Sequence, residues 1–173
     1  MRGIASAVVV AVGLLGLTGP VAAQDKAVSA PAPAPSVWRL EDETSKLDGT
    51  RRITVGMVSL GKAGAQGVFM LRCINGQIDG LVAWPAYMGS AATHRVRWKT
   101  DAGDLRTEEW TAAPGGRRSS LWVRNVKGFV AALSGKSELV VGAEPYGEGE
   151  RVLVFPIAGF DDIASPLRAA CNL

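Results

Sequence analysis

The chain has 173 residues, with 19 basic and 16 acidic side chains, one histidine and two cysteines. Its net charge of +3 is close to balanced, which argues against the strongly basic surface of a nucleic-acid-binding protein. An apolar content of 47% and this length fit a single domain with a sizeable core.

The first 23 residues have the pattern of a secretory signal peptide. Arg2 gives a positive start, residues 4–17 form an apolar run, and Gly19 and Pro20 interrupt it. Residues 21–23, Val-Ala-Ala, then match a cleavage motif of small residues. A spanning helix needs about 20 mostly apolar residues, so we expect cleavage rather than anchoring. Export through the inner membrane predicts a periplasmic protein with no membrane span after cleavage.

A linker and one domain follow the predicted leader. Residues 24–36 alternate alanine and proline, which is typical of an extended, semi-rigid segment without packed structure. The predicted domain covers residues 37–173, and Trp38 begins its folded part. Cleavage removes only one charged residue, so 18 basic and 16 acidic side chains remain.

The domain is dominated by segments in which apolar and polar residues alternate with period two. This pattern predicts strands at 51–60, 67–73, 77–84, 94–100, 119–125, 137–146 and 151–157. The short turn between the second and third segments indicates a tight hairpin. The sequence "GEGE" predicts the turn between the last two of these strands.

Two short helices are expected as well. In residues 125–135, Phe129 and Leu133 are spaced i, i+4, and Gly135 is a candidate C-cap. The second helix lies at the C-terminus. Asp161 or Asp162 can cap its start, and Ser165-Pro166 is an alternative start because proline suits the first helical position.

The two cysteines predict a disulfide between Cys73 and Cys171, because export places them in an oxidising compartment. Cys73 belongs to the core-facing set of its strand, and Cys171 follows Ile163 and Leu167 at helical spacing. The alternative is a reactive thiol, which would need basic neighbours or a CxxC motif. A bridge that closes a loop of about 100 residues stabilises by about 4.7 kcal/mol in the chain-entropy model. It would tie a terminal helix to a core strand.

These elements predict a mainly β fold, an antiparallel β-sandwich or a partly open barrel. Its two short helices would cover an end or an edge of the sheet. The disulfide would join the C-terminal helix to a core strand.

The residues give little support for catalysis or metal binding. The single histidine, His94, shares a strand face with Val96 and Trp98, which indicates a residue at the edge of the core. A zinc site needs three or four ligands, mainly cysteine and histidine, and one histidine with two bridged cysteines does not supply them. We therefore expect no enzyme activity, no metal and no cofactor.

Paired carboxylates leave a hydrolase as a minor alternative, because glycosidases use two acidic residues across a cleft. The pairs lie in turns or at a helix start, where solvation and capping explain them. They are Glu41 and Glu43, Glu108 and Glu109, Glu148 and Glu150, and Asp161 and Asp162.

The strongest candidate for partner binding is a basic stripe. Arg95, Arg97 and Lys99 alternate with His94, Val96 and Trp98, so the three cations share the face opposite the predicted core. Arg117 and Arg118 add a basic turn. The stripe is either a solvated face protected by its charges or a docking face for an acidic protein or an envelope polymer.

Four segments in order resemble the type VI secretion-associated VasI/TagO-like periplasmic proteins. They are Trp38 with "SKLDGTRRITVGM", "LRC" (71–73), "VRWKTDAGDLRTEEWTA" (96–112) and "FPIAGFDDIASPLRAAC" (155–171). The chain departs from the family pattern at Asp48-Gly49, where a second aspartate is expected, and at Lys99, where an acidic residue is expected.

The resemblance implies a β-rich, non-enzymatic accessory protein of the cell envelope that is associated with a type VI secretion system. Its partner would be another envelope protein. The alternative is a periplasmic inhibitor or immunity-like protein that blocks an envelope-lytic enzyme.

Overall fold

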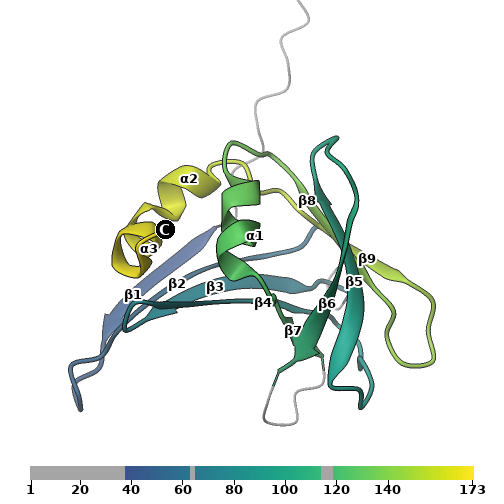
Figure 1. The fold of residues 1–173 in the computed structure, drawn as a ribbon, viewed down its shortest axis with the longest axis horizontal. Helices are drawn as coiled ribbons and strands as arrows, with labels where there is room; N and C mark the ends of the chain where they lie inside the picture. The colour runs from purple at the N-terminus through teal and green to yellow at the C-terminus, as the bar shows by residue number, and fades with distance from the viewer. Residues whose placement is uncertain (1–37, 63–64, 114–118) are drawn as a thin grey trace, which may run out of the picture. The chain divides into compact units, whose positions relative to one another are not determined.

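The computed structural model describes residues 38–62, 65–113 and 119–173 (Figure 1). The predicted signal peptide and linker lie outside the described residues, as do Arg117 and Arg118 of the predicted binding surface. No helix among the described residues is both long and apolar enough to cross a membrane.

The described strands form one antiparallel sheet in the order β1-β2-β3-β4-β7-β6-β5-β8-β9. Their bounds are β1 (Arg39–Thr44), β2 (Arg51–Val58), β3 (Val68–Ile74), β4 (Gln77–Ala83), β5 (Thr93–Thr100), β6 (Arg106–Ala112), β7 (Ser120–Trp122), β8 (Leu139–Ala143) and β9 (Arg151–Phe155). The predicted fold, mainly β and antiparallel, is confirmed. The sheet is open rather than closed into a barrel.

The sheet bends strongly, so that β1–β4 make one wall and β5, β6, β8 and β9 turn away from it (Figure 1). Its edge strands, β1 and β9, are not paired with each other in the described part of the chain. The chain just after β2 nevertheless reaches β9, where the Leu60 N–H donates to the Val154 carbonyl at 2.7 Å. The sheet is therefore curled but not closed.

The predicted hairpin between the second and third expected strands is present between β3 and β4. Ile74 pairs with Gln77, so the loop consists of Asn75 and Gly76 alone. Both have positive φ, at 50° and 74°. Asn-Gly is the dipeptide that a two-residue hairpin turn of this hand favours.

The strands β1 and β6 were not expected from the alternation. All six residues of β1 are exposed, so no apolar period marks it. In β6 a single residue, Trp110, is buried. β1 is instead defined by its backbone pairing with β2. β6 is defined by its backbone pairing with β5 and with β7.

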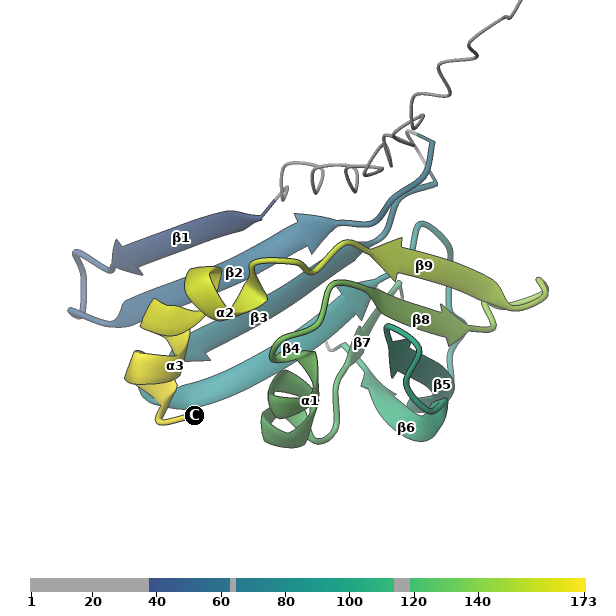
Figure 2. The ribbon, with the colours of Figure 1, turned by 90° about the horizontal axis from the view of Figure 1, so that it is seen from above.

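In the described part of the chain three helices, rather than the predicted two, lie on the inner face of the bent sheet. They are α1 (Val126–Leu133), α2 (Phe160–Ile163) and α3 (Ser165–Cys171). Figure 2 shows α3 over β2 and β3 and α1 beside β4, in agreement with their contacts. The helices thus cover a face of the sheet and not an end or an edge.

The helix ends partly follow the prediction. Gly135 has φ of +68° just after α1, the left-handed conformation that glycine adopts beyond a helix end. The predicted start of the C-terminal helix at Asp161 or Asp162 is wrong. The cap of α2 is Gly159, and both aspartates lie in the first turn. A second helix, α3, begins at Ser165 with Pro166 in its first turn, so the predicted alternative start at Ser165-Pro166 is confirmed for α3.

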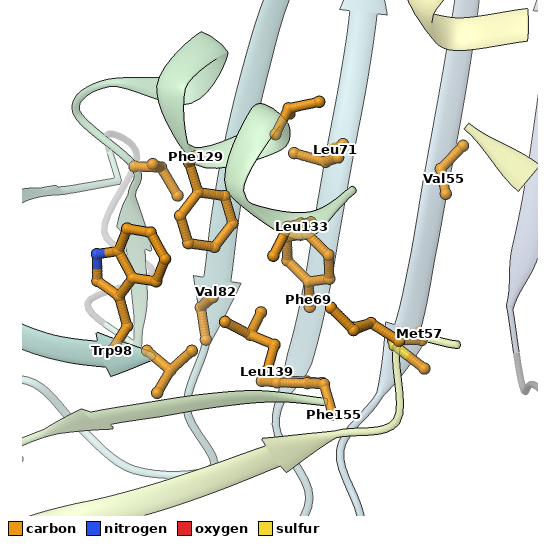
Figure 3. Packing of buried hydrophobic residues seen from close by; sticks show 14 of the residues in the cluster. Val55, Met57, Phe69, Leu71, Val82, Trp98, Phe129, Leu133, Leu139 and Phe155 are labelled. Carbon is orange, nitrogen blue, oxygen red and sulfur yellow. The ribbon is translucent and has the colours of Figure 1, made fainter. Parts of the chain in front are cut away.

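The core lies between the helices and the inner face of the sheet. Phe129 of α1 packs against Trp98 and Phe69, with ring centroids at 4.7 and 5.9 Å (Figure 3). Its ring centroid is also 5.7 Å from that of Trp110. Such edge-to-face pairs add to the free energy of apolar burial. Helix α1 therefore joins the two parts of the bent sheet through one aromatic side chain.

The predicted disulfide between Cys73 and Cys171 is present, with a Cα–Cα distance of 6.0 Å. Both cysteines are buried, and the bond fixes α3 to β3. Disulfides persist in oxidising compartments, so this bond is consistent with a location outside the cytoplasm.

Candidate functional site

The outer face of β5 carries the predicted basic stripe. Val96 and Trp98 are buried toward the helices, whereas Arg95 and Arg97 are exposed on the opposite face. Lys99 lies on the same outer face and is partly exposed. The alternation of β5 therefore separates its two faces as expected.

Arg97 is held by an acidic partner that the sequence did not indicate. Its Nε donates to Glu150 Oε1 at 2.7 Å, and its Nη2 donates to Glu150 Oε2. Arg97 lies opposite Gly142 of β8, and a Cβ on this glycine would lie 2.8 Å from Glu150 Oε1. The missing side chain therefore leaves room for the carboxylate. The hydrogen bond from Arg97 lowers the pKa of Glu150 and holds it ionised.

The stripe borders a polar cleft of about 500 Å³ across β6, β5 and β8. The charged groups that line the cleft are two guanidinium groups and three carboxylates, from Arg95, Arg97, Glu109, Glu144 and Glu150. Strand pairing produces this mixture, because Arg95 lies opposite Glu109. The cleft is thus nearly balanced in charge and not uniformly basic.

His94 is among the residues that line the cleft, although it belongs to the β5 face opposite Arg95 and Arg97. It is half-buried, as expected for a residue at the edge of the core. Its Nε2 is shielded from solvent and has no hydrogen-bond partner among the described residues. A shielded ring nitrogen without a partner is unfavourable, so any group that reached it would gain a hydrogen bond.

Two exposed tyrosines lie near Gly89, outside the cleft lining. Tyr87 and Tyr146 are 51% and 75% exposed, and their rings meet edge to face at 6.0 Å. The Tyr146 N–H donates to the Tyr87 carbonyl at 2.9 Å, which fixes the two loops together. A Cβ on Gly89 would lie 3.6 Å from Tyr146 Cβ and 3.9 Å from His94 Cε1, so both side chains border this glycine.

In the described structure, four of the eight paired carboxylates have structural partners, Glu150 with Arg97 among them. Glu108 accepts a hydrogen bond from Trp110 Nε1 at 3.1 Å, and Glu148 pairs with Arg151 at 2.6 Å. Asp161 accepts hydrogen bonds from the Ser134 hydroxyl and the Gly135 N–H, both at 2.7 Å.

A general acid needs a pKa near the working pH. The pKa values of Glu150 and Asp161 are both lowered, chiefly by hydrogen bonds from Arg97 and Ser134 respectively. These two carboxylates are therefore poor proton donors. Among the residues that the structure describes, no three metal-ligating side chains cluster.

Sequence reasoning found the stripe but missed the rest of the cleft. Glu144 and Glu150 lie about 50 residues from Arg97 and reach it through the pairing of β5 with β8 and the β8–β9 connection. Glu109 could have been placed if 106–112 had been recognised as the hairpin partner of β5. The tyrosines lie in loops, and no spacing marks them.

No protein-family model matches the chain, and no curated protein matches it. Among solved structures, the fold is similar to that of invasion associated protein B from Bartonella henselae, with a TM-score of 0.58 and 14% sequence identity. The match covers 80% of this chain and 96% of that chain. At this identity the likeness concerns the fold and transfers no residue role.

Proposed function

We propose that this chain is an exported, non-enzymatic binding or accessory protein of the bacterial cell envelope. It contacts its partner, another envelope protein, through the outer face of β5. One observation carries the proposal: the outer face of β5 presents a charged surface while its inner face is filled by the core. The signal-peptide pattern and the disulfide support export.

The association with a type VI secretion system is part of the same proposal and is based on the four resembling segments of the sequence. The name of the structural neighbour refers to invasion and describes that protein. The likeness to the solved structure supports only the β-rich fold in this proposal.

Capture from an envelope extract of the source organism tests the proposal. Mature protein is immobilised at low and at high salt, and captured proteins are identified by mass spectrometry. The matched variant replaces Arg95, Arg97 and Lys99 with serine. We expect the stripe to capture a component of an envelope machine at low salt, and the triple variant to lose it, because rim charges act on association rate.

Two outcomes would contradict this function. Equal capture by the triple variant at low salt would place the contact elsewhere. Turnover of purified envelope glycan, abolished by substitution of a carboxylate pair, would make the chain a hydrolase. If the captured protein is instead a lytic enzyme that the chain inhibits, the inhibitor alternative replaces the secretion role.

A further inference from the structure

We propose that the outer face of β2, β3, β4 and β7 is an interface through which two copies of this chain form a symmetric dimer. The surface is separate from the basic stripe on β5, so this inference goes beyond the partner contact proposed above. It depends on an apolar patch and on the way in which strand pairing arranges that patch.

The patch consists of apolar side chains that alternate with the buried residues of these four strands. None of them belongs to the core cluster in the described part of the chain, and all are at least partly exposed. They are Val58, Val68, Met70, Leu81, Ala83 and Trp122. The solvent face of an antiparallel sheet is commonly polar, as the outer face of β5 is. A contiguous apolar patch on such a face marks an interaction site.

The composition of the patch also indicates a protein interface, because tryptophan, methionine and arginine are enriched in such interfaces. The guanidinium group of Arg72 lies over the ring of Trp122, with 5.5 Å between Cζ and the ring centroid. Arg72 also donates to the carboxylate of Asp79 at 2.9 Å. The border of the patch thus carries one cation and one anion, and each holds the other in place.

Strand pairing aligns the patch in rows that run across the strands. Within each row the residues are direct Cα partners in the antiparallel register. The central row is Gly56, Met70, Leu81 and Trp122. The row on one side is Val58, Val68, Ala83 and Ser120. The row on the other side is Thr54, Arg72 and Asp79.

The central row has a hollow at one end and a bulky side chain at the other. Gly56 has no side chain, and a Cβ there would lie only 3.0 Å from the Phe69 carbonyl oxygen. It belongs to a groove of about 320 Å³ that Val68 and Met70 also line. Trp122 is three strands away, at a distance of about 14 Å in the spacing of a sheet.

A second copy of the chain is the partner that fits this row. A two-fold axis through the middle of the patch, parallel to the strands, runs between β3 and β4. In such an interface the same surface of both copies is in contact. Each residue then faces the residue at the opposite place of the same row in the other copy. Trp122 faces the hollow at Gly56, and Met70 faces Leu81.

The same rotation matches the charges. Arg72 of each copy faces Asp79 of the other, so opposite charges meet on both sides of the axis. A partner with charges of a single sign would be repelled by one member of this pair. Two sheets that pack face to face keep their strands aligned within about 30°, as this axis requires. One rotation thus provides complementary shape, apolar contact and charge.

The size of the patch indicates the strength of the dimer. Three rows across four strands cover roughly 400 Å² at the spacings of an antiparallel sheet. Stable complexes bury about 800 Å² on each partner. The dimer should therefore be weak and reversible, and its population should rise with the concentration of the chain.

Sedimentation equilibrium of the mature, oxidised chain at several concentrations tests the dimer. We expect a reversible equilibrium between monomer and dimer. Trp122→Ala should weaken the association about tenfold or more, because it leaves the hollow empty. Leu81→Ala should weaken it as well. Leu105→Ala, at an exposed leucine between β5 and β6, is the matched control and should leave it unchanged. Circular dichroism confirms that each variant is folded.

Reversal of single charges tests the symmetry of the contact. Arg72→Asp places acidic groups opposite each other across the axis, and Asp79→Arg places basic groups there. Each variant alone should therefore be mainly monomeric. A mixture of the two variants should form a dimer again, because each copy then carries the charge that faces its opposite. An interface elsewhere on the chain does not predict this recovery.

Three results would overturn the inference. One is a chain that stays monomeric up to about 1 mM. Another is a dimer that neither Trp122→Ala nor Leu81→Ala weakens. The third is a monomer that loses capture of another envelope protein in Trp122→Ala, which would assign the patch to that protein. The serine variant of the basic stripe should dimerise like the unmodified chain, so this inference and the proposed function can fail separately.

Discussion

The two faces of the sheet differ although the same strands build both. On β9, Leu153 is 2% exposed and its neighbour Val152 is 52% exposed. On β5, Trp98 packs against α1 while Arg97 pairs with Glu150 at the surface. The inner face is held by apolar packing and a disulfide, and the outer face by ion pairs in water. Stability should therefore reside on one face and recognition on the other.

The energies of the two faces differ accordingly. Burial of a large apolar side chain contributes about 1.5–3 kcal/mol, whereas an exposed ion pair contributes little. Substitutions at successive positions of one strand should then alternate between a large and a small loss in the free energy of unfolding.

Removal of the disulfide should have the largest effect. The variant Cys73→Ser with Cys171→Ser frees α3 from β3, and the unfolded chain regains the entropy of a loop of 98 residues. The free energy of unfolding should fall by about 4.7 kcal/mol. Denaturant unfolding of the oxidised protein and the double variant measures it. A loss below about 1 kcal/mol would mean that helix packing alone holds the C-terminus.

Adjacent residues of β9 provide the sharpest test of the two faces. Leu153→Ala should reduce the free energy of unfolding by about 2–5 kcal/mol, because it leaves a cavity against Gly67. Val152→Ala, one residue earlier on the outer face, should change it by less than about 0.5 kcal/mol. Denaturant midpoints of both variants give the comparison. Equal losses would show that the outer face also contributes to the core.

The features that the sequence predicted are those that local pattern determines. The alternation of 51–60 and 94–100 identified β2 and β5 and their buried faces, because one side of each strand meets the core. The cysteine pair was predictable from the signal-peptide pattern together with the apolar spacing around Cys73 and Cys171. In both cases neighbouring residues carry the information.

The features that were missed depend on distant partners. β1 has no buried position, so only its pairing with β2 makes it a strand. The single predicted C-terminal helix breaks at Ala164, where α2 ends and α3 begins. The Arg97–Glu150 pair joins residues 53 positions apart and requires the space above Gly142. No local spacing encodes these contacts.

Replacement of the stripe should test the outer face without disturbing the inner one. The serine variant at Arg95, Arg97 and Lys99 should keep a thermal midpoint close to that of the unmodified chain, because these side chains project from the outer face. Differential scanning calorimetry measures it. A clear drop would mean that the Arg97–Glu150 pair secures the connection between β8 and β9.

The smallest expected effect concerns Asp161, whose carboxylate lies between the end of α1 and α3. It accepts hydrogen bonds from Ser134 and Gly135 and forms an ion pair with Arg168 at 2.7 Å. These contacts, the Ser134 hydrogen bond first, lower the pKa of Asp161 below its ordinary value of 3.8. The ionised group therefore stabilises the folded state fully above about pH 3.8. That contribution is lost as the pH falls through the lowered pKa.

In the Asp161→Asn variant, the free energy of unfolding should fall less steeply as the pH is lowered through this acidic range. At neutral pH the variant should be slightly less stable than the unmodified chain, by an amount that hardly changes with pH. The neighbour Asp162 is exposed, and Asp162→Asn serves as the matched control. Urea midpoints between pH 2 and 7 measure all three proteins. Because the Asp161–Arg168 pair is partly exposed, added salt should reduce the difference. An identical acid decline in Asp161→Asn and the unmodified chain would show that Asp161 does not link α1 to α3.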